Sequence, residues 1–232
     1  MNYSSNGDPL IKFINVSKNF KNKKVLENIN FSINKKSIIT LVGPNGAGKS
    51  TIAKLILGIE HPSSGKIKKS YGLNFGYVPQ EIKLNSSLPL KVKNLLSLLT
   101  NNNDENSELL SFAKIEDIGS QDISEISGGQ LRKVFLVSCL MNNVDLIVLD
   151  EPTKELDIIG QQQFYNLINQ VREKFQITIF IISHDLHTVI KTSDQVLCIN
   201  HHLCCYGKPM EQYDKIMKHI GFYQHHHNHL HQ

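Results

Sequence analysis

The sequence predicts an α/β fold with a parallel core sheet, and two observations lead to this prediction. Near-continuous apolar runs at residues 37–42, 145–149 and 176–182 are typical of strands that are buried on both faces. Helical patterns at 48–57 and 160–174 follow such runs. This alternation of strands and helices implies a parallel sheet that is covered on both sides.

The rest of the chain adds elements of other kinds. Residues 10–16 and 30–33 alternate between apolar and polar side chains, which indicates strands of a sheet with an exposed edge. The region 84–140 contains a leucine-rich helical segment at 92–99 and then the polar run TNNNDENSE. We expect that run to be a surface loop within a helical insertion. After about residue 193, short strand-like pieces and a small helix lead to a histidine-rich tail.

Composition limits the function classes. The chain has 232 residues, 40% of them apolar, and suits one large domain or a domain with an insertion. A net charge of +4, with 11 histidines counted as neutral, is too mild to indicate nucleic acid binding. Four cysteines in a chain of this length do not indicate a disulfide framework, and Cys139 is expected in the core.

The sequence also bears on location. The N-terminus lacks the basic start and apolar core of a secretion signal, and the apolar runs are far shorter than the roughly 20 residues that span a bilayer. We therefore expect a cytoplasmic protein. If it works at a membrane, another chain must anchor it.

The segment GPNGAGKS at 43–50 fits the pattern G-x-x-x-x-G-K-[ST], and it stands between a predicted strand and a predicted helix. That context favours a phosphate-binding loop over a glycine-rich turn without a ligand. Backbone N–H groups and the helix N-terminus would face a triphosphate, Lys49 would reach the β- and γ-phosphates, and Ser50 would offer its hydroxyl to Mg²⁺. The predicted nucleotide-binding residues of this loop are Gly43, Pro44, Asn45, Gly46, Ala47, Gly48, Lys49, Ser50 and Thr51.

A second motif, LIVLDEP, occupies residues 146–152. A buried strand that ends in Asp150 can bring a carboxylate to Mg²⁺, and Glu151 can polarise the attacking water as general base. By itself an apolar run that ends in Asp-Glu could be a plain strand terminus. The phosphate-binding loop upstream favours the catalytic interpretation.

Kinases, small GTPases and many motor proteins share those two motifs, and a third motif separates them from this chain. The segment ISGGQ at 126–130 resembles the signature of ATP-binding-cassette ATPases, which usually reads LSGGQ. Gln80 in YVPQ resembles the glutamine loop of that family, and His184 in IISHD resembles its switch histidine. The five motifs stand in the family's order and cover residues 43–184.

The resemblance implies a P-loop NTPase cassette with a parallel core sheet, an antiparallel N-terminal β subdomain and an inserted α-helical subdomain. It implies an ATPase domain at 1–200, with its helical insertion at about 84–140, and a His/Cys-rich C-terminal segment at 201–232. It also implies a homodimer, in which Ser127 and Gly129 would cap the γ-phosphate bound to the partner copy.

The resemblance implies roles for three further side chains. His184 would contact the γ-phosphate and hold Glu151 and the water in place. Gln80 would join Asp150 and Ser50 around Mg²⁺ and relay its presence to the helical insertion. Phe20 falls where the family places an aromatic ring against adenine, although it could equally be a core residue.

The chain departs from the family pattern in a few places. Ile126 replaces the first leucine of the signature, which is a mild change. Arginines are common at two positions of the following helix, and smaller residues are usual just before Asp157. The residues found there are Lys133, Ser138, Lys154, Glu155 and Leu156. None of these departures removes a catalytic group, but they leave the details of the dimer face open.

One nucleotide-binding domain without a membrane span implies a separate integral membrane permease. The resemblance to importer subunits further implies an external metal-binding protein as an indirect partner and a place on the cytoplasmic face of the bacterial inner membrane. Segments 198–209 and 225–232 concentrate imidazole and thiol groups, which suit zinc better than hard cations. Both segments resemble those of bacterial zinc-uptake ATPases. Import of manganese or iron, and a metal-sensing module with a weak ATPase, are the alternatives, and the tail could be solvated and idle. The zinc ligands that the tail would offer are His225, His226, His227, His229 and His231.

Overall fold

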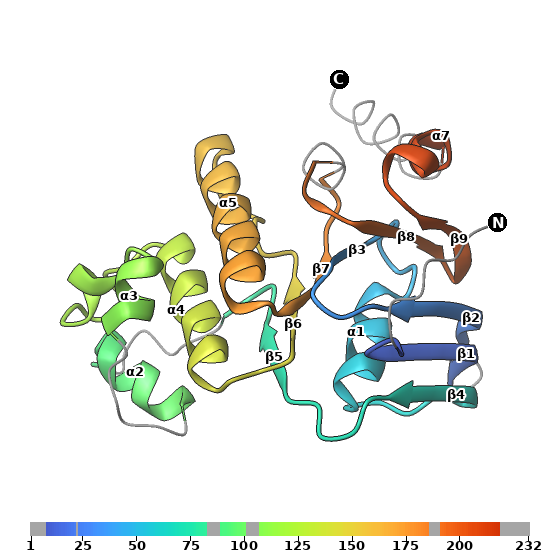
Figure 1. The fold of residues 1–232 in the computed structure, drawn as a ribbon, viewed down its shortest axis with the longest axis horizontal. Coiled ribbons are helices and arrows are strands. Elements are labelled where there is room, and N and C mark those ends of the chain that lie inside the picture. Colours follow the sequence, from blue (N-terminus) through green and yellow to red (C-terminus); the bar gives the residue numbers. More distant parts are fainter. Residues whose placement is uncertain (1–7, 22, 83–88, 101–106, 186–190, 219–232) are drawn as a thin grey trace. The chain divides into compact units, whose positions relative to one another are not determined.

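The computed structural model describes residues 8–21, 23–82, 89–100, 107–185 and 191–218. The chain divides into two compact units, one formed by residues 1–73 and 184–232 and the other by residues 74–183 (Figure 1). Each unit is described by itself below.

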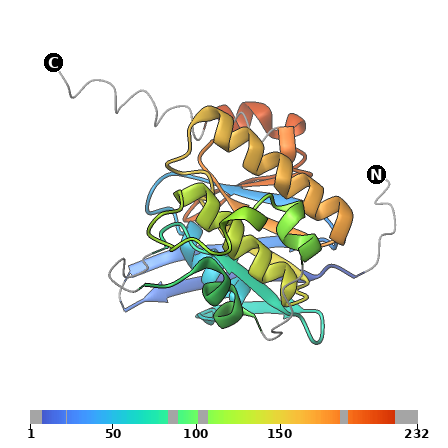
Figure 2. The same ribbon diagram turned by 90° about the vertical axis from the view of Figure 1, so that its left-hand side faces the viewer.

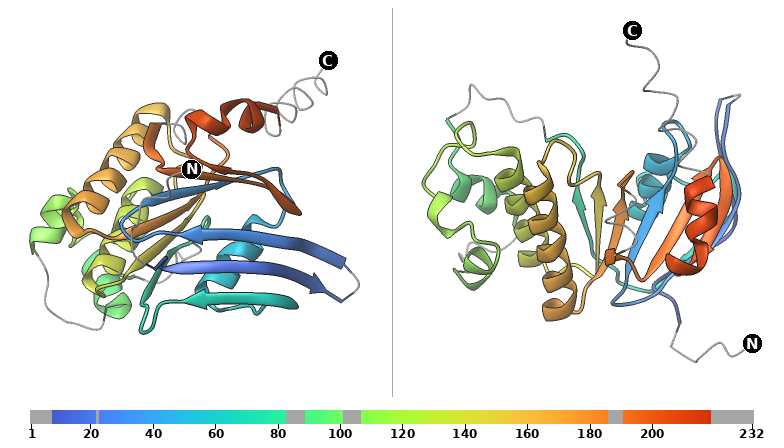
Figure 3. Two further views of the ribbon diagram at one scale, coloured as in Figure 1. Left: turned by 45° about the vertical axis from the view of Figure 1, so that its right-hand side comes forward. Right: turned by 90° about the horizontal axis from the view of Figure 1, so that it is seen from above.

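The first unit contains an antiparallel sheet in the order β2-β1-β4. Its strands are β1 (Ile11–Phe20), β2 (Lys23–Ile33) and β4 (Ser64–Lys69), which lie in front in the left view of Figure 3. Alternate apolar side chains of β1 and β2 point to one face, where the rings of Phe13 and Phe31 stack at 4.3 Å. The predicted N-terminal strands are confirmed, and both run further than their apolar pattern.

The first unit also contains β3 (Ile38–Val42), which runs parallel to β8 (Gln195–Asn200). All five residues of β3 are buried, as expected for a strand covered on both faces. Helix α1 (Lys49–Leu57) follows β3, as predicted from the helical pattern at 48–57, and Gly58 caps its C-terminal end. Strand β9 (His202–Gly207) pairs antiparallel with β8, and the short helices η2 (Met210–Gln212) and α7 (Tyr213–Ile216) follow it.

The second unit contains three parallel strands in the order β5-β6-β7. They are β5 (Phe75–Val78), β6 (Leu146–Asp150) and β7 (Thr178–Ile182), and every residue of β6 and β7 is buried. Helix α5 (Ile158–Phe175) connects β6 to β7 and is the predicted crossover helix. The predicted parallel α/β fold class is therefore confirmed.

The helices between β5 and β6 are α2 (Val92–Leu99), α3 (Ser107–Phe112), the 3-10 turn η1 (Glu116–Ile118) and α4 (Gly128–Met141). Figure 2 looks onto the helices of this unit. Helices α2 and α3 pack on α4, and α4 packs on β5. Cys139 on α4 is buried against Gly76 of β5, as predicted, and this burial raises the pKa of its thiol to about 11. Among the described helices, none is long and apolar enough to cross a bilayer.

Candidate nucleotide site

The glycine-rich loop joins β3 to α1 and approaches β8 very closely. A Cβ atom on Gly43 would lie 2.2 Å from the backbone oxygen of Ile199, so that this position has room only for glycine. Gly48 directly precedes α1 with φ 101°, in the left-handed region that glycine adopts without steric cost. The His201 N–H donates to the Ala47 oxygen at 3.1 Å. The loop is therefore fixed to the β8–β9 turn as well as to the strand and helix beside it.

Lys49 is the first residue of α1, and its side chain is held along the loop. The residue is only 8% exposed, and its ammonium donates to the backbone oxygens of Gly43 at 2.8 Å and Pro44 at 3.0 Å. The first turn of α1 carries no acidic side chain. The buried ammonium and the helix N-terminus therefore both favour a negatively charged ligand at this loop.

Asp150 ends β6 and is 7% exposed. The Tyr77 hydroxyl of β5 donates to its Oδ2 at 3.4 Å. Burial and the neighbouring Asp150 carboxylate raise the pKa of Tyr77 to about 12, so that the phenol stays protonated beside the acid. Gln80 lies just beyond β5, and because β5 and β6 are parallel neighbours, Gln80 and Asp150 stand at the same edge of the strands.

Glu151 has a strained backbone. Its φ of 46° lies in the left-handed region, which costs on the order of 1–3 kcal/mol for a residue that is not glycine. Its N–H donates to the Ile182 oxygen of β7 at 2.9 Å, which fixes the turn after β6. A strained residue at the end of a buried strand is a frequent feature of catalytic sites. His184 stands two residues beyond β7 and is exposed.

The segment ISGGQ forms the start of α4. Ser127 is the N-cap, its hydroxyl accepts from the Gln130 N–H at 3.2 Å, and the Gln130 side chain accepts from the Ser127 N–H at 2.8 Å. This capping box fixes the backbone at the N-terminus of a 14-residue helix. A Cβ atom on Gly129 would lie 3.1 Å from the Leu156 side chain. Gly129 thus lies against the loop that precedes α5.

Phe20 ends β1 in the unit that also contains the glycine-rich loop. Its side chain is 41% exposed, so Phe20 lies outside the buried core. The five tail histidines that the sequence offers as zinc ligands fall outside the described residues.

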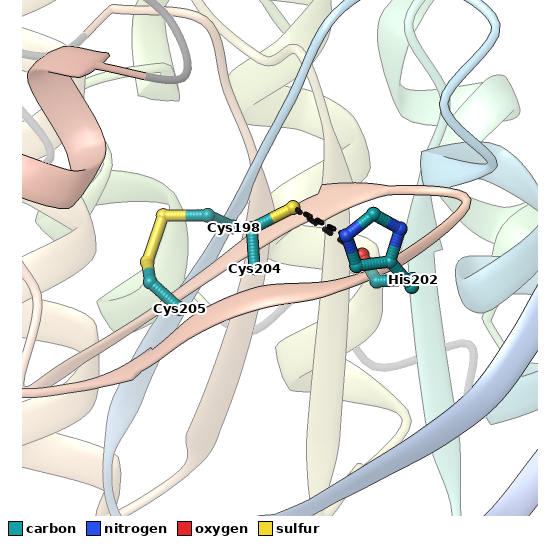
Figure 4. The surroundings of a disulfide bond; sticks show 4 residues. All are labelled: Cys198, His202, Cys204 and Cys205. Atoms are coloured by element: carbon teal, nitrogen blue, oxygen red, sulfur yellow. Dashed lines mark hydrogen bonds between the residues drawn. A yellow bond between two sulfur atoms is a disulfide. The ribbon is translucent and has the colours of Figure 1, made fainter.

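The C-terminal strands contain a feature that we did not expect from the sequence. A disulfide joins Cys198 of β8 to Cys205 of β9, while the Cys204 sulfur lies 3.6 Å from Nε2 of His202 on the other side of β9 (Figure 4). The described part of the chain contains no cluster of three or more His, Cys, Asp or Glu side chains that could hold a metal ion. The structure therefore offers no evidence for a zinc site in that part.

Comparison with known proteins assigns the family. A sequence profile described as ABC transporter matches residues 26–154, more than half of the chain. The chain belongs to the ABC transporter family. Membership implies an ATPase that uses ATP and Mg²⁺ as part of a transporter complex with membrane components.

The alignments with individual relatives extend over nearly the whole chain. The chain is 51% identical over 230 residues to the zinc import ATP-binding protein ZnuC of Rickettsia conorii, covering 96% of this chain and 99% of that protein. It is 41% identical to ZnuC of Haemophilus influenzae, covering 96% of this chain and 87% of the relative.

Solved ABC structures have the same fold at low sequence identity. The structure of cbiO1 from Clostridium perfringens, part of the ABC transporter complex cbiONQ, has a TM-score of 0.79 at 23% identity, covering 97% of this chain and 99% of that one. A nucleotide-free ATP-binding cassette from an ABC transporter also has a TM-score of 0.79 at 23% identity, covering 93% and 99%. These likenesses support the fold.

Proposed function

We propose that this chain is the ATP-hydrolysing subunit of a bacterial zinc importer. The observation that carries the proposal is the 51% identity that extends over 99% of a relative named for zinc import. The buried Lys49 ammonium and the loop around it supply the anion-binding groups that an ATPase needs.

The side chains offered to Mg²⁺ fit this ion. Ser50 provides a hydroxyl, Gln80 an amide oxygen and Asp150 a carboxylate, and hard oxygen donors are the ligands that Mg²⁺ prefers. When bound, Mg²⁺ would neutralise charge on the β- and γ-phosphate oxygens. The Tyr77 hydroxyl would keep the Asp150 carboxylate oriented by its hydrogen bond.

Glu151 would act as the general base. The hydrogen bond from its N–H to the Ile182 oxygen fixes the backbone of the turn from which the carboxylate would reach the attacking water. His184 would hold the water and Glu151 in place. In a homodimer, Ser127 and Gly129 of one copy would cap the γ-phosphate bound at Lys49 of the other, because a helix N-terminus attracts anions. Hydrolysis would then release the two copies from each other.

A separate integral membrane permease would carry the metal, with an external metal-binding protein acting on the far side of the membrane. The chain would lie at the cytoplasmic face of the inner membrane. The histidine-rich tail would bind zinc and sense delivered metal. The tail lies outside the ATPase motifs, which stand between Gly43 and His184.

The cargo is tested by metal uptake. Cells that lack the gene are starved of zinc and supplied with the wild-type chain, the Glu151→Gln variant or no chain, and uptake of zinc, manganese and iron is measured. The wild-type chain is expected to restore zinc uptake alone. Restored manganese or iron uptake without zinc uptake would contradict the assignment of cargo.

The chemistry is tested on the purified protein. Glu151→Gln is expected to bind MgATP as the wild type does and to lose hydrolysis by about 10²-fold or more. Because the nucleotide then persists, the variant should elute as a dimer in gel filtration with ATP. Wild-type turnover by the variant would exclude Glu151 as the base, and absent turnover by the wild type would favour a metal-sensing module.

A further inference from the structure

Lys18 makes three contacts at the end of β1. Its ammonium lies 4.8 Å from the centroid of the Phe20 ring, donates to Oε2 of Glu60 at 2.7 Å and donates to the His61 backbone oxygen at 2.8 Å. The Lys18 side chain is only 12% exposed. A cation over an aromatic face is attracted by the ring quadrupole, and a largely desolvated cation is attracted more strongly.

Glu60 is the charged partner that keeps this ammonium in place. The hydrogen bond and the positive charge of Lys18 lower the pKa of Glu60 below its ordinary value. Glu60 is therefore ionised at neutral pH, and the contact is a charge-assisted hydrogen bond. The Glu60 side chain is 30% exposed, so the pair is partly shielded from water.

The partners of Lys18 belong to the segment that follows α1. The N–H groups of Ile59 and Glu60 donate to the Lys54 oxygen of α1, at 2.9 and 3.2 Å. The same segment is tied to β1 again, since Ser63 Oγ accepts from the Asn19 N–H at 3.0 Å. The end of β1 is thus fastened to the C-terminal end of the helix whose N-terminal end carries the phosphate-binding loop.

We propose that Lys18 and Glu60 form a brace that holds the Phe20 ring in place as a platform for the adenine base of ATP. This inference rests on the proposed function, in which the loop at 43–51 binds the phosphates of the same nucleotide. Lys18 occupies one face of the ring, and the 41% exposure of Phe20 leaves the ring open to a base. Lys18 is a positioning residue here, because it acts through Phe20.

The brace has two physical effects. It restricts the ring before the nucleotide arrives, so that less conformational freedom is lost on binding. It also fixes the ring relative to α1, and through α1 relative to the loop that would take the phosphates. Because stacking uses the π-face that every base has, the platform should favour a nucleotide over a bare triphosphate without strong choice between ATP and GTP.

The test separates base binding from phosphate binding. Dissociation constants are measured for MgATP and for magnesium tripolyphosphate, which has no base, with the wild type, Lys18→Met and Phe20→Leu. Both variants are expected to weaken MgATP binding by about five- to tenfold and to leave tripolyphosphate binding within about twofold. The KM for ATP should rise by a similar factor while kcat is retained.

Two further variants control for folding and for loss of surface charge. Lys18→Arg keeps the cation and its hydrogen bonds, and is expected to retain nearly wild-type affinity. Lys24→Met removes a lysine of β2 that contacts Glu27 at the same 2.7 Å but is 56% exposed, and is expected to change neither constant. The double variant Lys18→Met/Phe20→Leu should bind MgATP no more weakly than Phe20→Leu alone, because Lys18 acts through the ring.

Each other outcome contradicts either the brace or the adenine platform. If Phe20→Leu weakens MgATP binding and Lys18→Met does not, the brace is refuted and the platform stands. If neither variant weakens MgATP binding, the whole platform is wrong, while Lys49→Ala still tests the phosphate loop independently. If Lys18→Met weakens MgATP and tripolyphosphate equally, Lys18 acts on the phosphates or the fold, and the proposed role is excluded.

Discussion

Replacement of Gly43 by alanine tests the close approach of the phosphate-binding loop to β8. The new Cβ would lie 2.2 Å from the Ile199 backbone oxygen, far inside the distance at which such atoms pack. This oxygen belongs to a strand that pairs with β3, so it cannot rotate away as the end of a side chain could. Inserted atoms that force such a backbone shift cost about 1–3 kcal/mol of unfolding free energy.

The matched control is Gly119→Ala. Gly119 has φ −54°, and a Cβ there would find its nearest neighbour at 3.8 Å, an ordinary contact. A substitution of this kind is expected to change the unfolding free energy by no more than about 0.5 kcal/mol. Urea unfolding of the two variants and the wild type measures the difference.

The MgATP dissociation constant gives a second measurement on the same variants. Gly43→Ala should also bind MgATP more weakly, since the loop can relieve the contact only by moving its N–H groups. Gly119→Ala should bind it as the wild type does. Equal urea midpoints for both variants would refute the close approach that the structure shows.

Two further predictions concern pH and redox state. The pKa of Tyr77 is about 12 in the folded protein, against 10.0 for an unperturbed tyrosine such as that of the unfolded chain. As the pH rises from 10.0 to about 12, the unfolded chain therefore loses this proton first, and the free energy of unfolding falls. Tyr77→Phe should remove that part of the alkaline loss, which urea midpoints at several pH values measure; an unchanged profile would contradict the raised pKa of Tyr77, whose largest cause is burial. Reduction of the Cys198–Cys205 disulfide, which closes a short loop, should lower the unfolding free energy by about 2 kcal/mol. Titration of the unfolded chain should count two thiols before reduction and four after it, and four thiols in the oxidised protein would exclude the bond.

The sequence was most informative where a strand is buried on both faces. The apolar runs of β3, β6 and β7 are buried at every position, so that local hydrophobicity alone predicts them. Strand β4 (SGKIKK) was not predicted, because none of its residues is buried and its sequence has no apolar alternation. It is held by pairing with β1, a contact between distant parts of the chain.

The candidate site also has one part that the sequence predicts and another part that only the fold reveals. The phosphate loop and the signature are contiguous segments whose chemistry can be seen in a few adjacent residues, whereas their supporting contacts join distant positions. The hydrogen bond from Tyr77 to Asp150 and the pairing of Cys198 with Cys205 follow from strand neighbours. Cysteines on either side of a tight turn could have indicated a cross-strand disulfide, but the register of β8 and β9 was needed to show that they face each other.

Two of the atypical residues before Asp157, Glu155 and Leu156, contact the helix that begins within the signature. Arg132 of α4 is 5% exposed, and its Nη2 lies 3.7 Å from the Glu155 carboxylate. Among the described residues, its Nε and Nη1 have no hydrogen-bond partner, so this carboxylate is the charge that compensates the buried guanidinium. Leu156 fills the space that the missing side chain of Gly129 leaves. Glu155 and Leu156, two of the residues that depart from the usual pattern, therefore both contact the first turns of α4 and join them to the loop before α5.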